Sequence, residues 1–229
     1  MPLNSNFISF DEPSLDKAVA GFEVTGNCSL RKSFAFPNSS TVFNPYSGKR
    51  FLLLDDPGAI RGGPGSISGE RTEKAAAAAC PLKEYWTFAS ITGSLTKGYD
   101  GAQLTCPDVS IKAGQSIGFF CRLGSHLFMA GAWNDFAVFA AITHSGDFVH
   151  EIPICDTEGL QDPSGFTRVG RPHPGGWMAF SVPFNSAFKG TLVWTVANGQ
   201  LVADRLQTVD DRAGCWPSCL AIDHITVAG

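Results

Sequence analysis

The feature that most constrains this chain is a series of short apolar runs, nearly all of five to nine residues, spread along its 229 residues. Runs of this length, rich in β-branched and aromatic residues, are typical of strands rather than helices. They cover residues 7–10, 22–30, 50–54, 85–92, 116–123, 136–143, 177–182, 191–196 and 220–227. The series predicts an all-β protein.

Turn-forming segments separate the runs. The chain has 25 Gly and 14 Pro, and many of them cluster in segments such as 44–48, 62–65 and 172–176. Such residues supply a positive φ or a fixed φ, so we expect turns and long exposed loops there. Segment 70–79 has high helix propensity but ends at Cys80-Pro81, which predicts one short helix or a flexible loop. The composition favours a single β-sandwich over residues 1–229, with at most one or two short helices.

Side-chain alternation separates two kinds of strand. Residues 136–142 are apolar at both parities, which predicts a strand buried on both sides. Phe180, Val182 and Phe184 share one parity and predict a single buried face. In residues 220–227 the apolar parity changes near Asp223, which indicates a bulge or a ligand site at that residue.

Charge excludes one class of partner. The formal net charge is −4 and the basic residues are dispersed, so the chain has no basic stripe for nucleic acid. No run of about 18 apolar residues is present, so we expect no membrane span.

Cysteine usage points to an oxidising compartment. Seven cysteines are many for a cytosolic protein, and Cys215 and Cys219 are close enough in sequence for a small-ring disulfide. The pairing stays open among Cys28, Cys80, Cys106, Cys121, Cys155, Cys215 and Cys219, and the odd number leaves one thiol unpaired or intermolecular. We therefore expect a secreted or extracellular protein with at least one disulfide, although the opening Met1 to Asn6 lacks the pattern of a secretion signal.

Three segments resemble bacterial secreted jelly-roll domains of the carbohydrate-binding-module-like and galactose-binding-like type. They are Ile8-Ser9-Phe10-Asp11-Glu12 with Gly21-Phe22-Glu23-Val24, then Trp133-Asn134-Asp135-Phe136-Ala137-Val138, and finally Leu220-Ala221-Ile222-Asp223 before Ile225 and Val227. The resemblance is at the level of the superfamily. It implies a jelly-roll sandwich that binds a glycan or another extracellular surface ligand.

The same resemblance implies a structural calcium between the first and last strands, with Asp11 or Glu12 and Asp223 as ligands. Calcium takes six to eight oxygen ligands from carboxylates and carbonyl groups, which irregular strand ends can supply. The alternative is that Asp11 and Glu12 are solvated while Asp223 accepts a hydrogen bond from a neighbouring loop.

Aromatic residues beside turns are the best candidates for stacking on a sugar, with polar neighbours to bind its hydroxyl groups. These candidates are Tyr46, Trp133 and Trp216, with Asn134, Asp135 and Asp211. The alternative for each ring is a structural plug in the core. Trp86, Trp177 and Trp194 lie within predicted strands, and we interpret them as core residues.

Catalysis has little support in the sequence. The five histidines lack the spacing of a zinc site, and Gly114-Gln115-Ser116-Ile117-Gly118 precedes an apolar strand like an ordinary turn. A non-catalytic binding module is therefore our first hypothesis. The alternatives are a self-associating structural or adhesive protein, in which the abundant Phe residues and an unpaired cysteine form interfaces between copies, and a jelly-roll enzyme that degrades polysaccharides.

Overall fold

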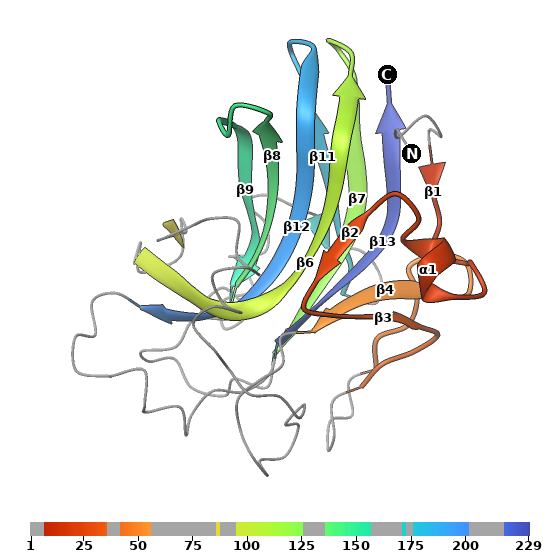
Figure 1. The fold of residues 1–229 in the computed structure, drawn as a ribbon. Helices are drawn as coiled ribbons and strands as arrows, with labels where there is room; N and C mark the ends of the chain where they lie inside the picture. The colour runs from red at the N-terminus through yellow and green to blue at the C-terminus, as the bar shows by residue number, and fades with distance from the viewer. Residues whose placement is uncertain are drawn as a thin grey trace.

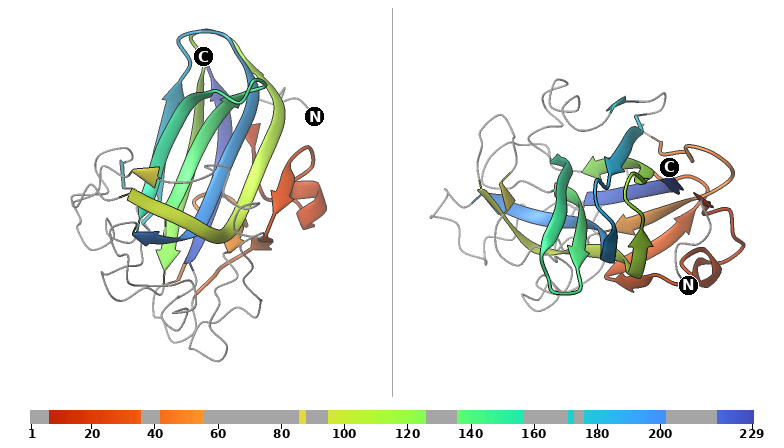
Figure 2. Two further views of the ribbon diagram at one scale, coloured as in Figure 1. Left: turned by 60° about the vertical axis from the view of Figure 1, so that its left-hand side comes forward. Right: turned by 90° about the horizontal axis from the view of Figure 1, so that it is seen from above.

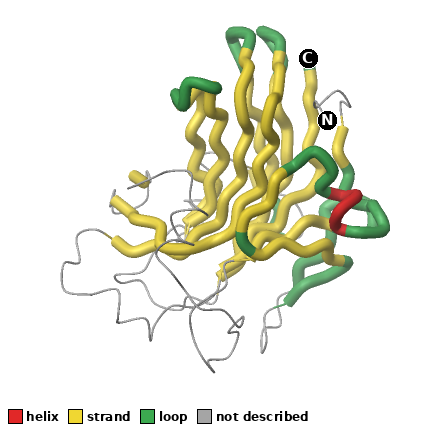
Figure 3. The backbone as a smooth tube through the Cα atoms, in the orientation of Figure 1, coloured by secondary structure: helices red, strands yellow, loops and turns green. Residues whose placement is uncertain are grey.

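The computed structural model describes residues 7–35, 42–55, 86–87, 95–125, 136–156, 171–172, 176–201 and 218–229. These residues form two antiparallel sheets that pack face to face, with one short helix, α1 (Leu15–Ala18), beside them (Figures 1 and 3). The predicted all-β sandwich is confirmed. Within the described part of the chain, no helix is long and apolar enough to cross a membrane.

The first sheet has seven strands in the order β10-β11-β7-β13-β4-β3, and β1 pairs with the outer part of β13. Their bounds are β1 Phe7–Ile8, β3 Asn27–Arg31, β4 Phe51–Asp55, β7 Ser116–Ser125, β10 Arg171–Pro172, β11 Met178–Pro183 and β13 Ser218–Ala228.

The second sheet has six strands in the order β2-β6-β12-β8-β9, and β5 pairs with β6. Their bounds are β2 Glu23–Thr25, β5 Trp86–Thr87, β6 Leu95–Ile111, β8 Phe136–Thr143, β9 Phe148–Asp156 and β12 Phe188–Leu201. The two sheets appear as two layers when the molecule is viewed from above (Figure 2).

The strand order is that of a jelly roll. Along the eight central strands β4, β6, β7, β8, β9, β11, β12 and β13, the chain changes sheet at every step except between β8 and β9, which pair with each other in the second sheet. The result is β4-β13-β7-β11 in one layer facing β6-β12-β8-β9 in the other. This is the eight-stranded arrangement of two Greek keys that defines a double-sheet jelly roll.

Glycine 26 explains one difference from the sequence prediction. The run 22–30 is not one strand, because Gly26 has a φ of +78° and ends β2 before β3 begins. The left-handed region is open to glycine at little steric cost. The break sends β2 to the second sheet and β3 to the first.

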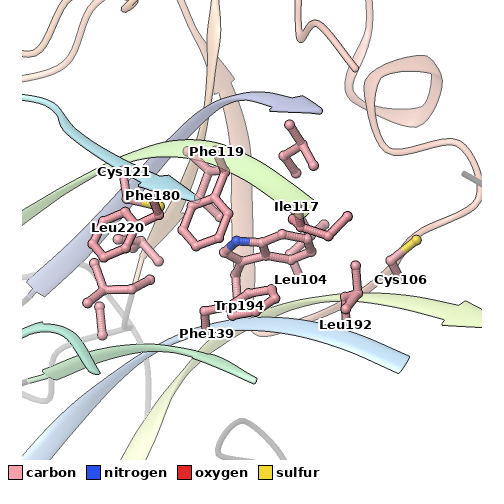
Figure 4. Close-up of a cluster of buried hydrophobic side chains, with 14 of the residues drawn as sticks. Leu104, Cys106, Ile117, Phe119, Cys121, Phe139, Phe180, Leu192, Trp194 and Leu220 are labelled. Atoms are coloured by element: carbon pink, nitrogen blue, oxygen red, sulfur yellow. The ribbon is translucent and has the colours of Figure 1, made fainter. Parts of the chain in front are cut away.

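The main core lies between the two layers and is built around Trp194 of β12 (Figure 4). Its ring meets Phe119 edge to face, with centroids 5.6 Å apart, and Phe119 stacks on Phe180 at 5.0 Å. Burial of each such side chain stabilises the fold by about 1.5–3 kcal/mol. The core also receives Phe180, Val182 and Phe184 from the face that the sequence predicted.

Candidate functional site

The outer face of the second sheet is defined by the side chains of β6, β12 and β8 that point away from the core. Leu192, Trp194 and Val196 of β12 lie in the core, so the intervening Val193, Thr195 and Ala197 point outward. Thr195 pairs with Gln103 of β6 on one side and with Val138 of β8 on the other. Directly paired residues of antiparallel strands share a face, which puts Gln103, Thr195 and Val138 in one outward row.

Two neighbouring polar atoms in this row have no partner. Within the part of the chain that the structure describes, Oε1 of Gln103 and Oγ1 of Thr195 are buried and make no hydrogen bond. The amide Nε2 of Gln103 donates to Oγ1 of Thr105 at 2.6 Å. If the amide is turned over, Oε1 accepts from Thr105 instead and Nε2 is left over, so one amide atom stays unpaired in either orientation.

This arrangement is costly for a folded protein. A buried polar group without a partner destabilises the native state by about 1–3 kcal/mol. Nearly all buried polar groups in native structures are hydrogen-bonded to protein or to water, so two neighbouring unsatisfied atoms require an explanation. We call these two atoms, Oε1 of Gln103 and Oγ1 of Thr195, the unpaired pair. Both atoms are shielded from solvent, so a hydroxyl-bearing ligand would satisfy them only by displacing what covers them.

The side chains around Gln103 and Thr195 are small and apolar near the centre of the face and acidic at its two edges. Val193 of β12 and Ala140 of β8 are fully buried. The row that contains them begins at Glu23 of β2 and ends at Glu151 of β9, and both carboxylates are exposed. Partial burial raises the pKa of Glu151. The centre of this face is therefore buried and apolar around two polar atoms, and its acidic ends are exposed to solvent.

Tyr46, a predicted sugar-stacking residue, lies on the opposite side of the sandwich. Its ring is half-buried and stacks on Phe120 of β7, with centroids 3.6 Å apart and 15° between the planes. Trp177 meets Tyr46 edge to face at 6.5 Å and donates its Nε1 to the carbonyl of Asn44 at 3.0 Å. One face of the Tyr46 ring is therefore covered, and its role as a ligand contact stays a prediction.

Tyr46 belongs to what we call the aromatic cluster, on the outer face of the first sheet. The segment 43–46 lies across this face, and the guanidinium of Arg122 stands 4.0 Å over the ring of Phe43. The buried members of the cluster and the rings packed against them are Phe34, Phe43, Tyr46, Phe51, Leu53, Phe120, Trp177, Cys219 and Ala221. The cluster is a second, smaller core.

The remaining predicted ligand contacts, Trp133, Asn134, Asp135, Asp211 and Trp216, lie outside the described residues.

Two of the three predicted calcium ligands meet at the turn 46–50, which we call the clamped turn. Asp11 accepts from the backbone N–H groups of Lys49 at 2.6 Å and Arg50 at 3.0 Å. Asp223 Oδ2 accepts from the N–H of Ser47 at 3.1 Å. One carboxylate comes from the first segment and the other from the last strand, so the clamped turn ties the two ends of the chain together.

Glu12 does not join these carboxylates through its side chain. Its backbone carbonyl, together with that of Pro13, accepts from Nη1 of Arg50 at 2.8 Å and 2.9 Å. The Arg50 guanidinium is therefore hydrogen-bonded to two backbone carbonyl oxygens of the kind that can coordinate calcium.

The donor set, as arranged, does not fit a calcium shell. Oxygens of both carboxylates already accept N–H groups, and among the described residues no group of three or more His, Cys, Asp and Glu is placed to hold a metal. Calcium needs six to eight oxygen ligands. The hydrogen bonds account for the placement of Asp11 and Asp223 without a metal, and the calcium site stays a prediction for experiment.

A bulge in β13 shapes the position of Asp223. The pairing of β13 with β7 shifts between Asp223 and Thr226, and His224 has a φ of +58°. Burial is the main cause that raises the pKa of Asp223 to about 6. The parity change in the sequence therefore marked a true bulge.

Three of the seven cysteines carry free thiols in the structure, namely Cys28, Cys106 and Cys121. Burial raises the pKa of Cys28 to about 12 and that of Cys106 to about 11, so both thiols stay protonated near neutral pH. Cys219 is buried in β13, and its predicted partner Cys215 lies outside the described residues. No disulfide joins Cys28, Cys106 and Cys121, and the 215–219 bridge stays a prediction.

Comparison with known proteins finds similarity only among solved structures. No protein-family model and no curated protein matches the chain. The CBM22-1 xylan-binding domain of Xyn10C from Paenibacillus barcinonensis is 11% identical, with a TM-score of 0.35 over 97% of this chain and 91% of that domain. A carbohydrate-binding module of the β-sandwich superfamily is 13% identical, with a TM-score of 0.38 over 100% of this chain and 63% of that one.

The enzymatically active domain of tailspike protein 4 from bacteriophage CBA120 is also similar, at 8% identity and a TM-score of 0.36 over 96% of this chain and 21% of that one. Carbohydrate-binding modules are thus among the structures that the chain is similar to. At these TM-scores the similarity assigns no ligand and no role to any residue.

Proposed function

We propose that the protein is a non-catalytic glycan-binding domain whose ligand lies across the outer face of the second sheet. The observation that carries the proposal is the unpaired pair, Gln103 and Thr195, set side by side in the middle of that face. A sugar presents neighbouring hydroxyl groups, and each can donate and accept. Thr195 is fully buried in the free protein, so binding requires that this part of the face be uncovered. Two adjacent hydroxyls would then donate to Gln103 and bond with Thr195 and recover the hydrogen bonds that the free protein lacks.

The distance between the two acidic side chains at the edges of this face supports a non-catalytic role. Glu23 and Glu151 end the same row but are four strand steps apart, which at about 4.8 Å a step is about 19 Å. Carboxylates that cleave a glycosidic bond stand about 5–9.5 Å apart. These two therefore cannot flank one scissile bond, and we assign them to the rim of the site.

The setting that we propose is extracellular, where polysaccharides and cell-surface glycans are the abundant ligands of this chemistry.

The test is retention of the protein in native gels cast with a single polysaccharide, using xylan, mixed-linkage β-glucan, mannan and galactan in turn. We expect the wild type to be retarded by at least one of them. Thr195→Val keeps the shape of the side chain and removes the hydroxyl, and Gln103→Leu removes the amide. Each variant should weaken retention about tenfold, the value of one or two hydrogen bonds.

Thr226→Val is the matched control, because the Thr226 hydroxyl donates to the Gly118 carbonyl at 3.4 Å and belongs to β13 of the first sheet. It should bind like the wild type. Absence of retention on every polysaccharide, with light scattering showing a large assembly at all concentrations, would overturn the proposal in favour of a self-associating structural protein.

A further inference from the structure

The outer face of the second sheet continues beyond Ala140 to the tip of the β8–β9 hairpin. Ile142 has the outward parity of β8, and it pairs with Phe148 at the start of β9. Paired residues share a face, so the Phe148 ring lies on the same face as Gln103 and Thr195. Its side chain is 43% exposed.

Phe148 is unusual for its exposure. The large exposed hydrophobic residues in the described part of the chain are Val24, Val42, Phe148 and Val149, and Phe148 alone has an aromatic ring. A single exposed apolar residue needs no explanation by itself. A ring on the one face that also holds unpaired polar atoms is a more specific observation.

The hairpin beneath Phe148 is closely hydrogen-bonded. The N–H of Thr143 donates to the carbonyl of Asp147, and the N–H of Gly146 donates to the carbonyl of Thr143, both at 2.9 Å. The Ser145 hydroxyl donates to Oδ2 of Asp147 at 2.6 Å, and the N–H of Asp147 donates to Oγ1 of Thr143 at 3.0 Å. Gly146 has a φ of +92°, which closes the turn at little steric cost.

A bulge aims the ring outward. The pairing steps from Ala141 with His150 to Ile142 with Phe148, which leaves Val149 as the extra residue. His150 points inward and meets the ring of Phe184 edge to face at 4.8 Å. The inward anchor and the tight turn hold Phe148 in place, so little conformational entropy would be lost when a ligand covers it.

We propose that Phe148 is an aromatic subsite of the same glycan-binding face, on which a sugar ring stacks. The inference rests on the proposed function and extends it, because it defines the ligand as a chain rather than a single sugar. On β8, Ile142 pairs with Phe148 and Val138 pairs with Thr195, and these two β8 residues are four positions apart. Phe148 and Thr195 also lie two strands apart, on β9 and β12. At about 3.4 Å a residue and 4.8 Å a strand, Phe148 and Thr195 are about 17 Å apart along a diagonal.

A separation of this size exceeds one sugar ring. Only an oligosaccharide of several units reaches Phe148 and the unpaired pair together. Phe148 should therefore contribute to the binding of long chains and not to that of short ones.

The test is isothermal titration with oligosaccharides of two to six units, made of xylose, glucose, mannose or galactose according to the polysaccharide that retains the wild type. Phe148→Ala should weaken binding of the hexasaccharide by about three- to tenfold, as expected for the loss of one aromatic contact. Binding of the disaccharide should not change. Phe148→Tyr keeps the ring and should preserve binding at every length.

Val149→Ala is the matched control, since Val149 is 46% exposed and adjacent in the chain. It should bind like the wild type at every length. If Phe148→Ala binds the hexasaccharide normally while Thr195→Val weakens it, the aromatic subsite is overturned and the proposed function stands. If no oligosaccharide binds the wild type, both proposals fall.

Discussion

The outer face of the first sheet carries a packed cluster of large aromatic rings, whereas the centre of the outer face of the second sheet carries small side chains and two unpaired polar atoms, with the Phe148 ring at one end. On the first sheet, Nε1 of Trp177 and the carboxylate of Asp223 have hydrogen-bond partners, and Oδ1 of Asp55 is the one buried side-chain oxygen among the described residues of this face that has none. On the second, Gln103 and Thr195 stay unsatisfied at a cost in stability. The difference indicates that one face was built to stabilise the sandwich and the other to bind.

Trp177→Ala should give the largest effect and tests the stabilising face. The side chain is 2% exposed, packs on Phe51 with centroids 5.8 Å apart, and bonds the Asn44 carbonyl. Loss of such a ring destabilises a fold by about 3–5 kcal/mol. Urea unfolding should show this loss, and Phe148→Ala on the other sheet should change stability by less than about 0.5 kcal/mol. Equal losses in the two variants would erase the distinction between the faces.

Stability should also depend on pH through the first sheet. Burial is the main cause that raises the pKa of Asp55 and of Asp223 from 3.8 to about 6. A carboxyl group whose pKa is higher in the folded than in the unfolded state stabilises the fold while it is protonated. This contribution is complete below about pH 3.8, the unfolded-state pKa, and is lost as pH rises through about 6, the folded-state pKa. We expect the free energy of unfolding contributed by these groups to be about 1–3 kcal/mol higher at pH 4.5 than at pH 7.5.

Asp55→Asn sharpens this prediction. Oδ1 of Asp55 is buried without a partner among the described residues, so the charge is poorly compensated above pH 6. The variant should be more stable than the wild type at pH 7.5 and should show a smaller pH dependence. Urea unfolding at pH 4.5, 6 and 7.5 measures both quantities, and a pH dependence identical to that of the wild type would refute the role of Asp55.

A matched pair of Thr→Val variants compares the two sheets directly. Thr195→Val removes a buried hydroxyl that has no partner and should stabilise the protein by about 1 kcal/mol. Thr226→Val removes a hydroxyl that donates to Gly118 and should destabilise it by up to about 1 kcal/mol. Thermal unfolding of both variants at one pH gives the signs of the two changes. Two changes of the same sign would show that the two hydroxyls do not differ in hydrogen bonding as described.

Removal of calcium should give the smallest effect. The hydrogen bonds of the clamped turn account for Asp11 and Asp223 without a metal, so EGTA should leave the unfolding midpoint unchanged. A fall in the midpoint that added calcium restores would support the site expected from the resemblance, because a metal bound to the native state stabilises it. Asp11→Asn would then abolish the restoration.

Much of the sandwich could be predicted because burial leaves a clear pattern in its strands. Residues 136–143 are apolar at both parities and form β8, which is buried on both sides over residues 136–141. Trp177 and Trp194 are buried as expected. The parity change at Asp223 corresponds to the bulge before Thr226.

The longest strand and the candidate site were missed for one reason. Residues 95–111 contain Gly98, Gly101, Asp100 and Pro107, which disfavour strands locally, yet β6 forms because it pairs with β12 over most of its length. The alternation of Ala102, Leu104 and Cys106 with Gln103 and Thr105 is the signal that could have found it. That Gln103 meets Thr195 depends on pairing between distant segments, which local patterns do not encode.

Calorimetric titration of the most strongly retained polysaccharide into wild type and Thr195→Val, combined with the unfolding midpoints of both, determines whether the unpaired atoms of Gln103 and Thr195 bind the ligand. We expect a variant that is more stable and binds about tenfold more weakly, because one hydroxyl both destabilises the free protein and holds the ligand. A variant that binds as tightly as the wild type would show that the unpaired pair on the second sheet is not the binding site.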